Sequence, residues 1–177
     1  MATTYFVQTP RLLIRPLADT DFDLYFRMQA DPELMRYIRL PESDADAVRG
    51  RMATQLNYGA ENPGLGSMVG ISRETGQPVA TGVLRHVDYQ PGNDLELGYA
   101  VLRDFWGRGL ATEIARALAR YAFERFDAPR VFAFVDPENF PSQQVLQKCG
   151  FRLSGRRLVY DADCLEFLLE REGLISR

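Results

Sequence analysis

The sequence has few of the residues that build disulfide frameworks and metal sites. Its 177 residues include two cysteines, Cys149 and Cys164, and one histidine, His86. Two cysteines form neither a disulfide framework nor a metal site, and Cys149, just before a glycine, reads as a small buried group. His86 falls late in a predicted strand and is interpreted as structural. We therefore expect no metal in the function of this chain.

Long apolar runs and basic tracts are missing as well. No apolar stretch approaches the ~20 residues that span a bilayer. The opening MATTYFVQTPRLLIRP lacks the basic and apolar regions of a secretory signal. The net charge is −3 and there is no lysine-rich tract, which argues against an RNA- or ribosome-binding domain with a salt-sensitive basic face. The sequence favours a cytoplasmic protein without a membrane or nucleic-acid partner.

The remaining composition is that of a folded domain. Hydrophobic residues make up 46% and charged residues 25% of the chain, and no repeat or linker interrupts it, so residues 1–177 are predicted to form a single domain. Apolar periodicity predicts strands over 11–15, 67–72, 77–88, 94–102 and 128–135, and helices over 19–29, 43–58 and 111–126. Ser43 is expected to cap the second of these helices. A short helix within 141–151, ended by Gly150, and a hairpin over 157–170 complete the prediction.

The order of these elements predicts the fold class. Residues 94–135 read as strand, glycine loop, long helix and strand, which is the pattern of a right-handed crossover between parallel strands. Strands with short connections precede this unit and a hairpin follows it. We therefore expect an α+β (mixed α/β) fold: a central, mostly antiparallel twisted sheet with one parallel βαβ crossover and flanking helices.

The loop WGRGLAT, residues 106–112, places two glycines where the long helix begins. A glycine in a helix interior costs roughly 1 kcal/mol relative to alanine, and a close approach of the backbone to a ligand is a usual reason for it. Free amides at a helix N-terminus bind anions, so Gly107 and Gly109 favour a phosphate site, with Arg108 adding positive charge. A glycine-rich turn without a ligand is the alternative. The lysine of a P-loop is absent, and a dinucleotide fingerprint does not fit because Thr112 ends the motif and antiparallel strands come first.

WGRGLAT also resembles the pyrophosphate loop of the GNAT superfamily of N-acetyltransferases, whose pattern is Gln/Arg-x-x-Gly-x-Gly/Ala. Gly109 and Ala111 match its small residues, whereas Trp106 stands where Gln or Arg is usual. Four further segments are similar, in order and spacing, to the ribosomal-protein N-acetyltransferase branch: TPRLLIRPL (9–17), ELGYAV (96–101), NFPSQQVLQKCGF (139–151) and DADCLEFLLERE (161–172). The resemblance covers about residues 9–172.

This resemblance implies a GNAT fold and an enzyme that uses acetyl-CoA as cosubstrate. The pyrophosphate would lie on the amides of residues 107–112, and the pantetheine arm between the strands at 94–102 and 130–135. The acetyl group would pass by direct attack to a primary amine, either a protein N-terminus or a small molecule, and a homodimer is possible. The residues that the resemblance assigns to acetyl-CoA binding are Tyr99, Ala100, Val101, Gly107, Arg108, Gly109, Leu110, Ala111, Thr112, Asn139 and Ser142.

Two residues are predicted to be catalytic. Strand alternation puts Glu96 on the face opposite Leu95 and Leu97; by resemblance Glu96 is the general base, directly or through water, and the alternative is a strand-face carboxylate in a salt bridge. By resemblance Ser142 protonates the leaving thiolate or contacts the cosubstrate, and the alternative is an ordinary serine of a first helical turn.

Three further expectations concern the surroundings of these residues. Asn139 either binds pantetheine, caps the helix that follows, or does both. Tyr160 is a reserve acid or a packed aromatic side chain. Arg156 and Arg157 are expected in a solvated turn, with a position beside the acceptor site as the alternative. The acceptor pocket is expected from residues 31–42 and 155–164, since loops carry specificity on a fixed scaffold. A non-catalytic module that senses acyl-CoA is the rival function.

Overall fold

The computed structural model describes residues 5–89 and 92–175, so the expectation of no secretory signal, drawn from residues 1–16, lies partly outside it. The strands of the described chain form one sheet in the order β1-β2-β3-β4-β5-β6-β8-β7. Neighbouring strands are antiparallel except β5 and β6, which confirms a mostly antiparallel sheet with one parallel crossover. The strands are β1 Val7–Gln8, β2 Leu12–Pro16, β3 Gly66–Ser72, β4 Pro78–His86, β5 Leu95–Val101, β6 Arg130–Val135, β7 Arg152–Val159 and β8 Ala162–Glu170.

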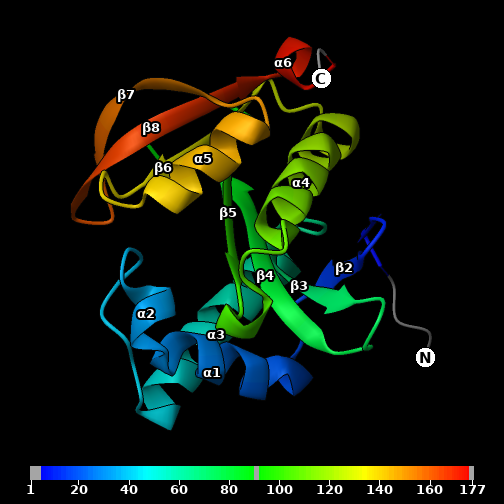
Figure 1. Cartoon of the computed structure of the whole chain (residues 1–177), viewed down its shortest axis with the longest axis vertical. Helices are drawn as coiled ribbons and strands as arrows, with labels where there is room; N and C mark the ends of the chain where they lie inside the picture. The colour runs from blue at the N-terminus through cyan, green and yellow to red at the C-terminus, as the bar shows by residue number, and fades with distance from the viewer. Residues whose placement is uncertain (1–4, 90–91, 176–177) are drawn as a thin grey trace.

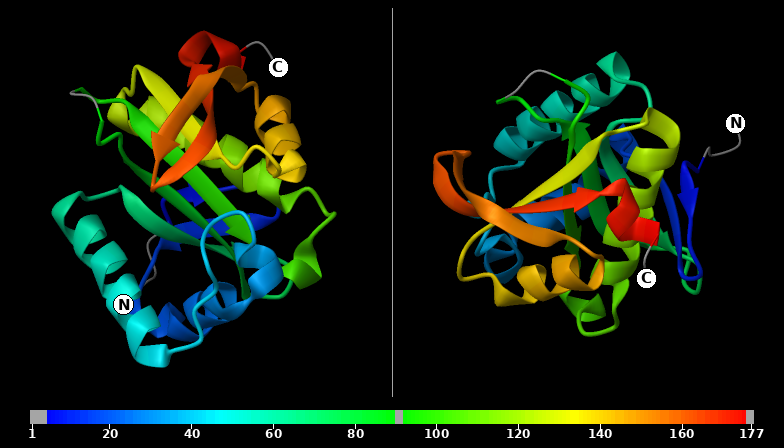
Figure 2. Two further views of the ribbon diagram at one scale, coloured as in Figure 1. Left: turned by 90° about the vertical axis from the view of Figure 1, so that its left-hand side faces the viewer. Right: turned by 90° about the horizontal axis from the view of Figure 1, so that it is seen from above.

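Helices cover both faces of this sheet, as Figures 1 and 2 show: α1 to α3 gather on one side, and α4 and α5 on the other. No helix in the described ranges is long and apolar enough to cross a bilayer. The helices are α1 Phe22–Ala30, α2 Pro32–Met35, α3 Ala45–Glu61, α4 Leu110–Phe126, α5 Phe140–Lys148 and α6 Arg171–Ile175, with 3₁₀ turns η1 at Asp19–Asp21 and η2 at Arg103–Phe105.

Helix α4 packs closely on the centre of the sheet. Leu110, Ile114 and Leu118 on one face of the helix are buried in the main core with residues of β4 and β5. The approach is close because Gly82 of β4 has no side chain; a Cβ built there would lie 2.4 Å from Cδ1 of Leu118. This packing fixes where α4 begins, and so places the glycine loop at the end of β5.

Two local predictions are wrong. Helix α3 is capped by Asp44 and not by Ser43, because a carboxylate oxygen of Asp44 accepts hydrogen bonds from the amides of Asp46 and Ala47, at 2.8 and 3.1 Å. The C-terminal hairpin begins at Arg152, so Arg156 and Arg157 lie within β7 and not in a turn. Both residues pair with β8 in the backbone ladder, which extends the strand, and their side chains bond to Asp163 and Glu166 respectively.

The parallel strands β5 and β6 pair over a short distance. Strand β5 pairs with β4 along its whole length, but with β6 only through Leu95↔Val131 and Glu96↔Phe132. Beyond Glu96 this pairing ends, and we call the opening between the two strands the β5–β6 gap. The gap leaves the second half of β5 without a hydrogen-bonded neighbour on one edge, and the candidate site is built around it.

Candidate active site

The loop at the start of α4 presents unpaired backbone amides. Gly107 and Gly109 have φ angles of +72° and +75°, a left-handed conformation that glycine adopts without a Cβ penalty. Within the described chain, none of the backbone N–H groups of residues 107–112 donates a hydrogen bond. Arg108 is exposed, with its guanidinium 5.2 Å from the ring centroid of Phe105. Free amides and one exposed cation at a helix N-terminus suit an anion.

Trp106 covers one end of this loop. The indole Nε1 of Trp106 donates a 2.6 Å hydrogen bond to the carbonyl oxygen of Val101, and its backbone N–H donates to Arg103. Trp106, which stands where the GNAT motif usually has Gln or Arg, therefore links the loop to Val101, the last residue of β5. Arg103 is in turn bonded to Asp31 at 2.7 Å, so its charge is compensated.

The edge of β5 that faces the gap carries backbone groups of two predicted residues. The amide of Leu102 donates to Val79 and the amide of Val87 to Asp94, which assigns the even-numbered residues of β5 to the ladder with β4. The N–H and C=O groups of Tyr99 and the N–H of Val101 are therefore open to the gap, whereas the Val101 carbonyl oxygen is bonded to Trp106. The backbone of Ala100 is used by the ladder with β4, so only its side chain is available to a ligand.

On the α4 and α5 side of the gap, the side chains of Tyr99 and Ser142 meet. The Tyr99 hydroxyl lies 3.0 Å from Oγ of Ser142 and 3.2 Å from its carbonyl oxygen. Burial raises the pKa of Tyr99 above its ordinary value, so the hydroxyl stays protonated. Asn139 caps α5, because its Oδ1 accepts a 3.1 Å hydrogen bond from the amide of Ser142; its Nδ2 group stays free for other partners.

On the opposite face of β5, Glu96 lies in a buried polar cluster. Its carboxylate accepts hydrogen bonds from the guanidinium of Arg85 at 3.2 and 3.3 Å, and from the hydroxyl of Tyr160. Glu96 therefore does lie in a salt bridge, which was the alternative to its catalytic role. Tyr160 is not simply packed: its backbone is left-handed, with φ of +54°, and its hydroxyl joins Glu96 and Arg85. Burial, followed by the bond to Glu96, raises the pKa of Tyr160.

Glu96 and Tyr160 also line a cavity of about 220 Å³ beside β5. Of the two segments expected to form the acceptor pocket, 155–164 contributes to this cavity and 31–42 does not. Asp88, Tyr89 and Phe134, half of the lining, could not be predicted from the sequence, because they belong to no motif and come together only in the folded sheet. The lining residues are Asp88, Tyr89, Glu96, Phe134, Val159 and Tyr160.

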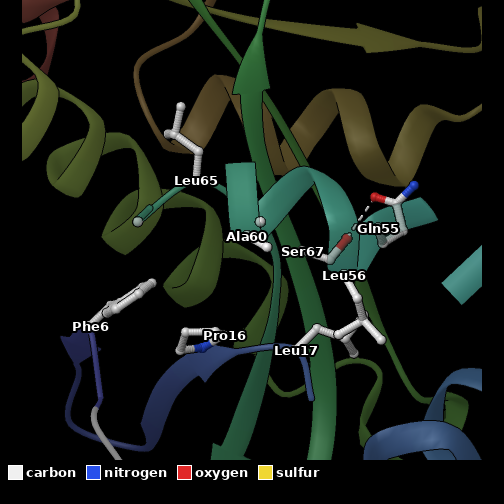
Figure 3. Close-up of a pocket in the computed structure, with 10 residues that line it drawn as sticks. Phe6, Pro16, Leu17, Gln55, Leu56, Ala60, Leu65 and Ser67 are labelled. Carbon is white, nitrogen blue, oxygen red and sulfur yellow. Dashed lines mark hydrogen bonds between the residues drawn. The ribbon is translucent and has the colours of Figure 1, made fainter. Parts of the chain in front are cut away.

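A second cavity, of about 230 Å³, lies elsewhere, between α3 and the strands β2 and β3 (Figure 3). Its wall is mainly apolar, and at one end the Ser67 hydroxyl donates to Gln55 at 2.9 Å. It shares no residue with the loop at 107–112 or with the β5–β6 gap. We do not assign it to the site.

The cysteines do not supply a nucleophile. Burial raises the pKa of the Cys149 thiol to about 11, and burial also raises the pKa of the Cys164 thiol. A thiol with a raised pKa is scarcely ionised near neutral pH and is a poor nucleophile. In the described ranges, His, Cys, Asp and Glu form no group of three that could hold a metal ion.

Comparisons with known proteins agree with this arrangement. The family model of an acetyltransferase (GNAT) domain matches residues 11–152. An uncharacterized N-acetyltransferase, p20 of Bacillus licheniformis, is 30% identical over 156 residues, which cover 88% of this chain and 85% of that protein.

Solved structures share the fold. An acetyltransferase from Agrobacterium tumefaciens is 27% identical, with a TM-score of 0.79 and coverage of 97% of this chain and 95% of that one. Mycobacterium smegmatis RimJ, solved in complex with CoA-disulfide, is 21% identical, with a TM-score of 0.77 over 92% of this chain and 83% of that one. The chain therefore belongs to the GNAT acetyltransferase family, and it is an enzyme whose acetyl donor is acetyl-CoA.

Proposed function

We propose that this enzyme transfers the acetyl group of acetyl-CoA to a primary amine by direct attack within the β5–β6 gap. One observation carries the proposal: the gap lies between a loop of free amides and a cavity lined by carboxylate and aromatic side chains. The amides suit a diphosphate, and the cavity suits a cationic amine. A module that only senses acyl-CoA would not need this cavity.

The donor is proposed to lie along the edge of β5. Its pyrophosphate would accept hydrogen bonds from the amides of residues 107–112, with Arg108 as a neighbouring cation. Its pantetheine arm would pair with the carbonyl oxygen of Tyr99 and the N–H of Val101, in the manner of an added strand. We propose that the amide group of Asn139 binds a pantetheine carbonyl. The thioester would then lie in the gap, between Ser142 on one face and Glu96 on the other.

The chemistry needs a base on the amine side of the gap. Free α-amino groups have a pKa near 8 and lysine side chains near 10.4, so near neutral pH a proton has to leave before attack. Glu96 and Tyr99 are three residues apart along β5, or about 10 Å at ~3.3 Å per residue. We therefore propose that Glu96 accepts the proton through water. The backbone N–H of Tyr99 would stabilise the tetrahedral oxyanion.

The second half of the reaction breaks the C–S bond. As the new C–N bond is retained, the electron pair of the C–S bond leaves with sulfur, and the thiolate takes up a proton. Ser142 is the proposed donor, with Tyr99 replacing its proton through their 3.0 Å contact. Because neither cysteine is an activated nucleophile, no acetyl-enzyme intermediate is needed.

Acceptor choice is assigned to the cavity at Glu96. Asp88 has no hydrogen-bond or ion-pair partner among the described residues, so it is available to pair with an ammonium group. A protein N-terminal amine and a small-molecule amine both meet this requirement. We propose the cytoplasm as the location, consistent with the two free cysteines; a homodimer stays a prediction.

A screen of amines with detection of free thiol tests the proposed function. The panel would contain short peptides with free or blocked N-termini, polyamines, amino acids and aminoglycosides, each with acetyl-CoA and enzyme. Thiol release with one class, and the matching acetylated product, identifies the acceptor. Tight binding of acetyl-CoA without thiol release on any amine would favour the sensing module.

Substitution of Ser142 by alanine tests the proton donor. We expect kcat to fall by about 100-fold, the lower end for general acid catalysis, while the affinity for acetyl-CoA changes by less than about threefold. Tyr99→Phe should have a similar effect, and the double variant should be little worse than either single one, because the two hydroxyls act in one relay. Steady-state kinetics and calorimetry measure both quantities.

Ser154→Ala is a suitable control, since the Ser154 hydroxyl bonds to Glu166 in the β7–β8 hairpin, away from α5. It should leave turnover unchanged. Unaltered turnover in Ser142→Ala would instead leave Ser142 as an ordinary residue of the first turn of α5.

A further inference from the structure

The N-terminal segment before β2 is bonded to the first turn of α4 through one carboxylate. Glu113 accepts three hydrogen bonds: from the Thr9 hydroxyl at 2.6 Å, from the amide of Arg11 at 2.8 Å, and from Nε of Arg11 at 2.6 Å. The partners are about a hundred residues apart in the sequence. Because both oxygens of the Glu113 carboxylate accept hydrogen bonds, two of them from Arg11, Glu113 holds the Arg11 side chain in one place.

From that place Arg11 reaches into the glycine loop. Its Nη1 donates a 2.7 Å hydrogen bond to the carbonyl oxygen of Arg108, the residue between the two left-handed glycines. We infer that Arg11, held by Glu113, sets the orientation of the Arg108–Gly109 peptide so that the Gly109 amide faces the acetyl-CoA pyrophosphate. This inference rests on the proposed position of the donor.

The geometry of the peptide bond explains why the contact matters. In a trans peptide the C=O and the following N–H point in opposite directions. A carbonyl of Arg108 that is fixed toward Arg11 therefore directs the N–H of Gly109 away from Arg11, to the outer side of the loop. Glycine has no Cβ to restrict rotation of this peptide. Without the hydrogen bond, the peptide is free to turn its carbonyl oxygen toward the phosphates, where it would repel them.

Only an arginine meets this requirement. Its planar guanidinium donates from Nε and Nη1 in a fixed relative geometry, so one side chain binds both Glu113 and the Arg108 carbonyl. Lysine, with a single ammonium group on a flexible stem, does not reproduce this fork. We therefore assign Arg11 and Glu113 as positioning residues, which act through the loop and do not touch the reacting atoms.

The contacts of Glu113 also compensate a negative charge close to the proposed diphosphate site. A carboxylate in the first turn of α4 is favourable for the helix dipole, but here it stands next to a proposed diphosphate site. Burial acts to raise the pKa of Glu113, but the hydrogen bonds from Thr9 and Arg11 outweigh it and lower the pKa below its ordinary value. Glu113 therefore stays ionised, and the cation of Arg11 compensates its charge.

Two substitutions test the inference by different routes. Arg11→Met removes the fork, and Glu113→Gln keeps an acceptor oxygen for Thr9 and the Arg11 amide but presents an NH₂ group to Nε of Arg11. We expect each to weaken acetyl-CoA binding by about tenfold, the scale of one lost hydrogen bond to a charged group. The KM for acetyl-CoA should rise in parallel, with kcat at saturation and the KM for the amine unchanged. Arg11→Lys should not restore affinity.

A direct readout is the Gly109 amide in ¹⁵N–¹H spectra of the full chain. In the wild type this signal should shift strongly as CoA is added, and in Arg11→Met it should shift little. Arg152→Met is the matched control, because it also removes an exposed arginine–glutamate pair, Arg152–Glu170 at 3.0 Å, and should bind acetyl-CoA as the wild type does.

The outcomes separate the two proposals. If the wild type itself does not bind acetyl-CoA, the proposed function fails. If the wild type binds and both variants match it in affinity and in the Gly109 shift, the loop is oriented without Arg11 and this inference is overturned. Weaker binding in the variants with an unchanged Gly109 shift would also overturn it, because the peptide would then not be the element that Arg11 controls.

Discussion

Gly109→Val is expected to weaken acetyl-CoA binding by about 100-fold, which corresponds to about 2.8 kcal/mol. The loop conformation at Gly109, with φ of +75°, is strained for any residue with a Cβ and most of all for a β-branched one. The branched side chain would also stand beside the amides that are proposed to bind the pyrophosphate. Calorimetric titration with acetyl-CoA, and with CoA alone, measures the loss.

The fold should survive this change, at a cost. A Cβ at Gly109 would meet its nearest neighbour, Nη2 of Arg11, at 3.5 Å, which is an ordinary contact. We therefore expect the backbone strain, about 1–3 kcal/mol of unfolding free energy, to be the main effect on stability. Thermal and denaturant unfolding of the variant without ligand gives this number.

Gly76→Val separates strain from ligand contact. Gly76 has a similar φ of +69° with open space around it, and it lies in the turn between β3 and β4, away from the gap. The two variants should lose similar stability, while only Gly109→Val loses affinity for the donor. Equal affinity in the two variants would show that the pyrophosphate does not lie on this loop.

Glu96→Gln is expected to lower kcat by about 100-fold at pH 7, the lower end of what general base catalysis contributes. The deficit should be largest at acidic pH and shrink as the pH approaches the pKa of the acceptor amine, because free amine then becomes available without a base. The affinity for acetyl-CoA should stay the same. Measurement of kcat against pH, with the acceptor identified by the amine screen, tests this.

A matched control exists in the same half of the sheet. Glu166 is 8% exposed, as Glu96 is, and its carboxylate bonds to Arg157 as that of Glu96 does to Arg85. Glu166→Gln therefore reproduces the loss of a partly buried arginine–carboxylate pair at a carboxylate that does not itself line the cavity. If the two variants have the same pH–rate profile, Glu96 serves as a structural partner of Arg85 and the base lies elsewhere.

The parts of the site that lie close together in the sequence could be predicted. The change from strand to glycine loop to long helix within residues 94–135 indicates a parallel crossover, because sheet and helix periodicities differ along the chain. The pairing of β5 with β6 and the start of α4 at Leu110 confirm it. The free amides of the loop follow from the same pattern, since a helix always leaves its first N–H groups unpaired.

Contacts across the sheet could not be predicted in the same way. Arg85 lies opposite Glu96 only through the register of β4 and β5, and Tyr160 reaches both from a hairpin more than sixty residues away. Glu113 reads as an ordinary acidic residue in the first turn of a helix, and nothing near it in the sequence points to Thr9 or Arg11. A pattern along one segment does not carry information on which distant segment packs against it.

The brevity of the β5–β6 pairing has a consequence for how the whole fold responds to its donor. With two residue pairs holding that junction, a molecule that inserts along β5 supplies bonds that the polypeptide itself does not make. Donor occupancy should therefore raise the melting temperature and slow amide exchange on both sides of the junction, because ligand that binds only the native state stabilises it by mass action. The thermal stability of this protein in a cell would then rise and fall with the concentration of the acetyl donor.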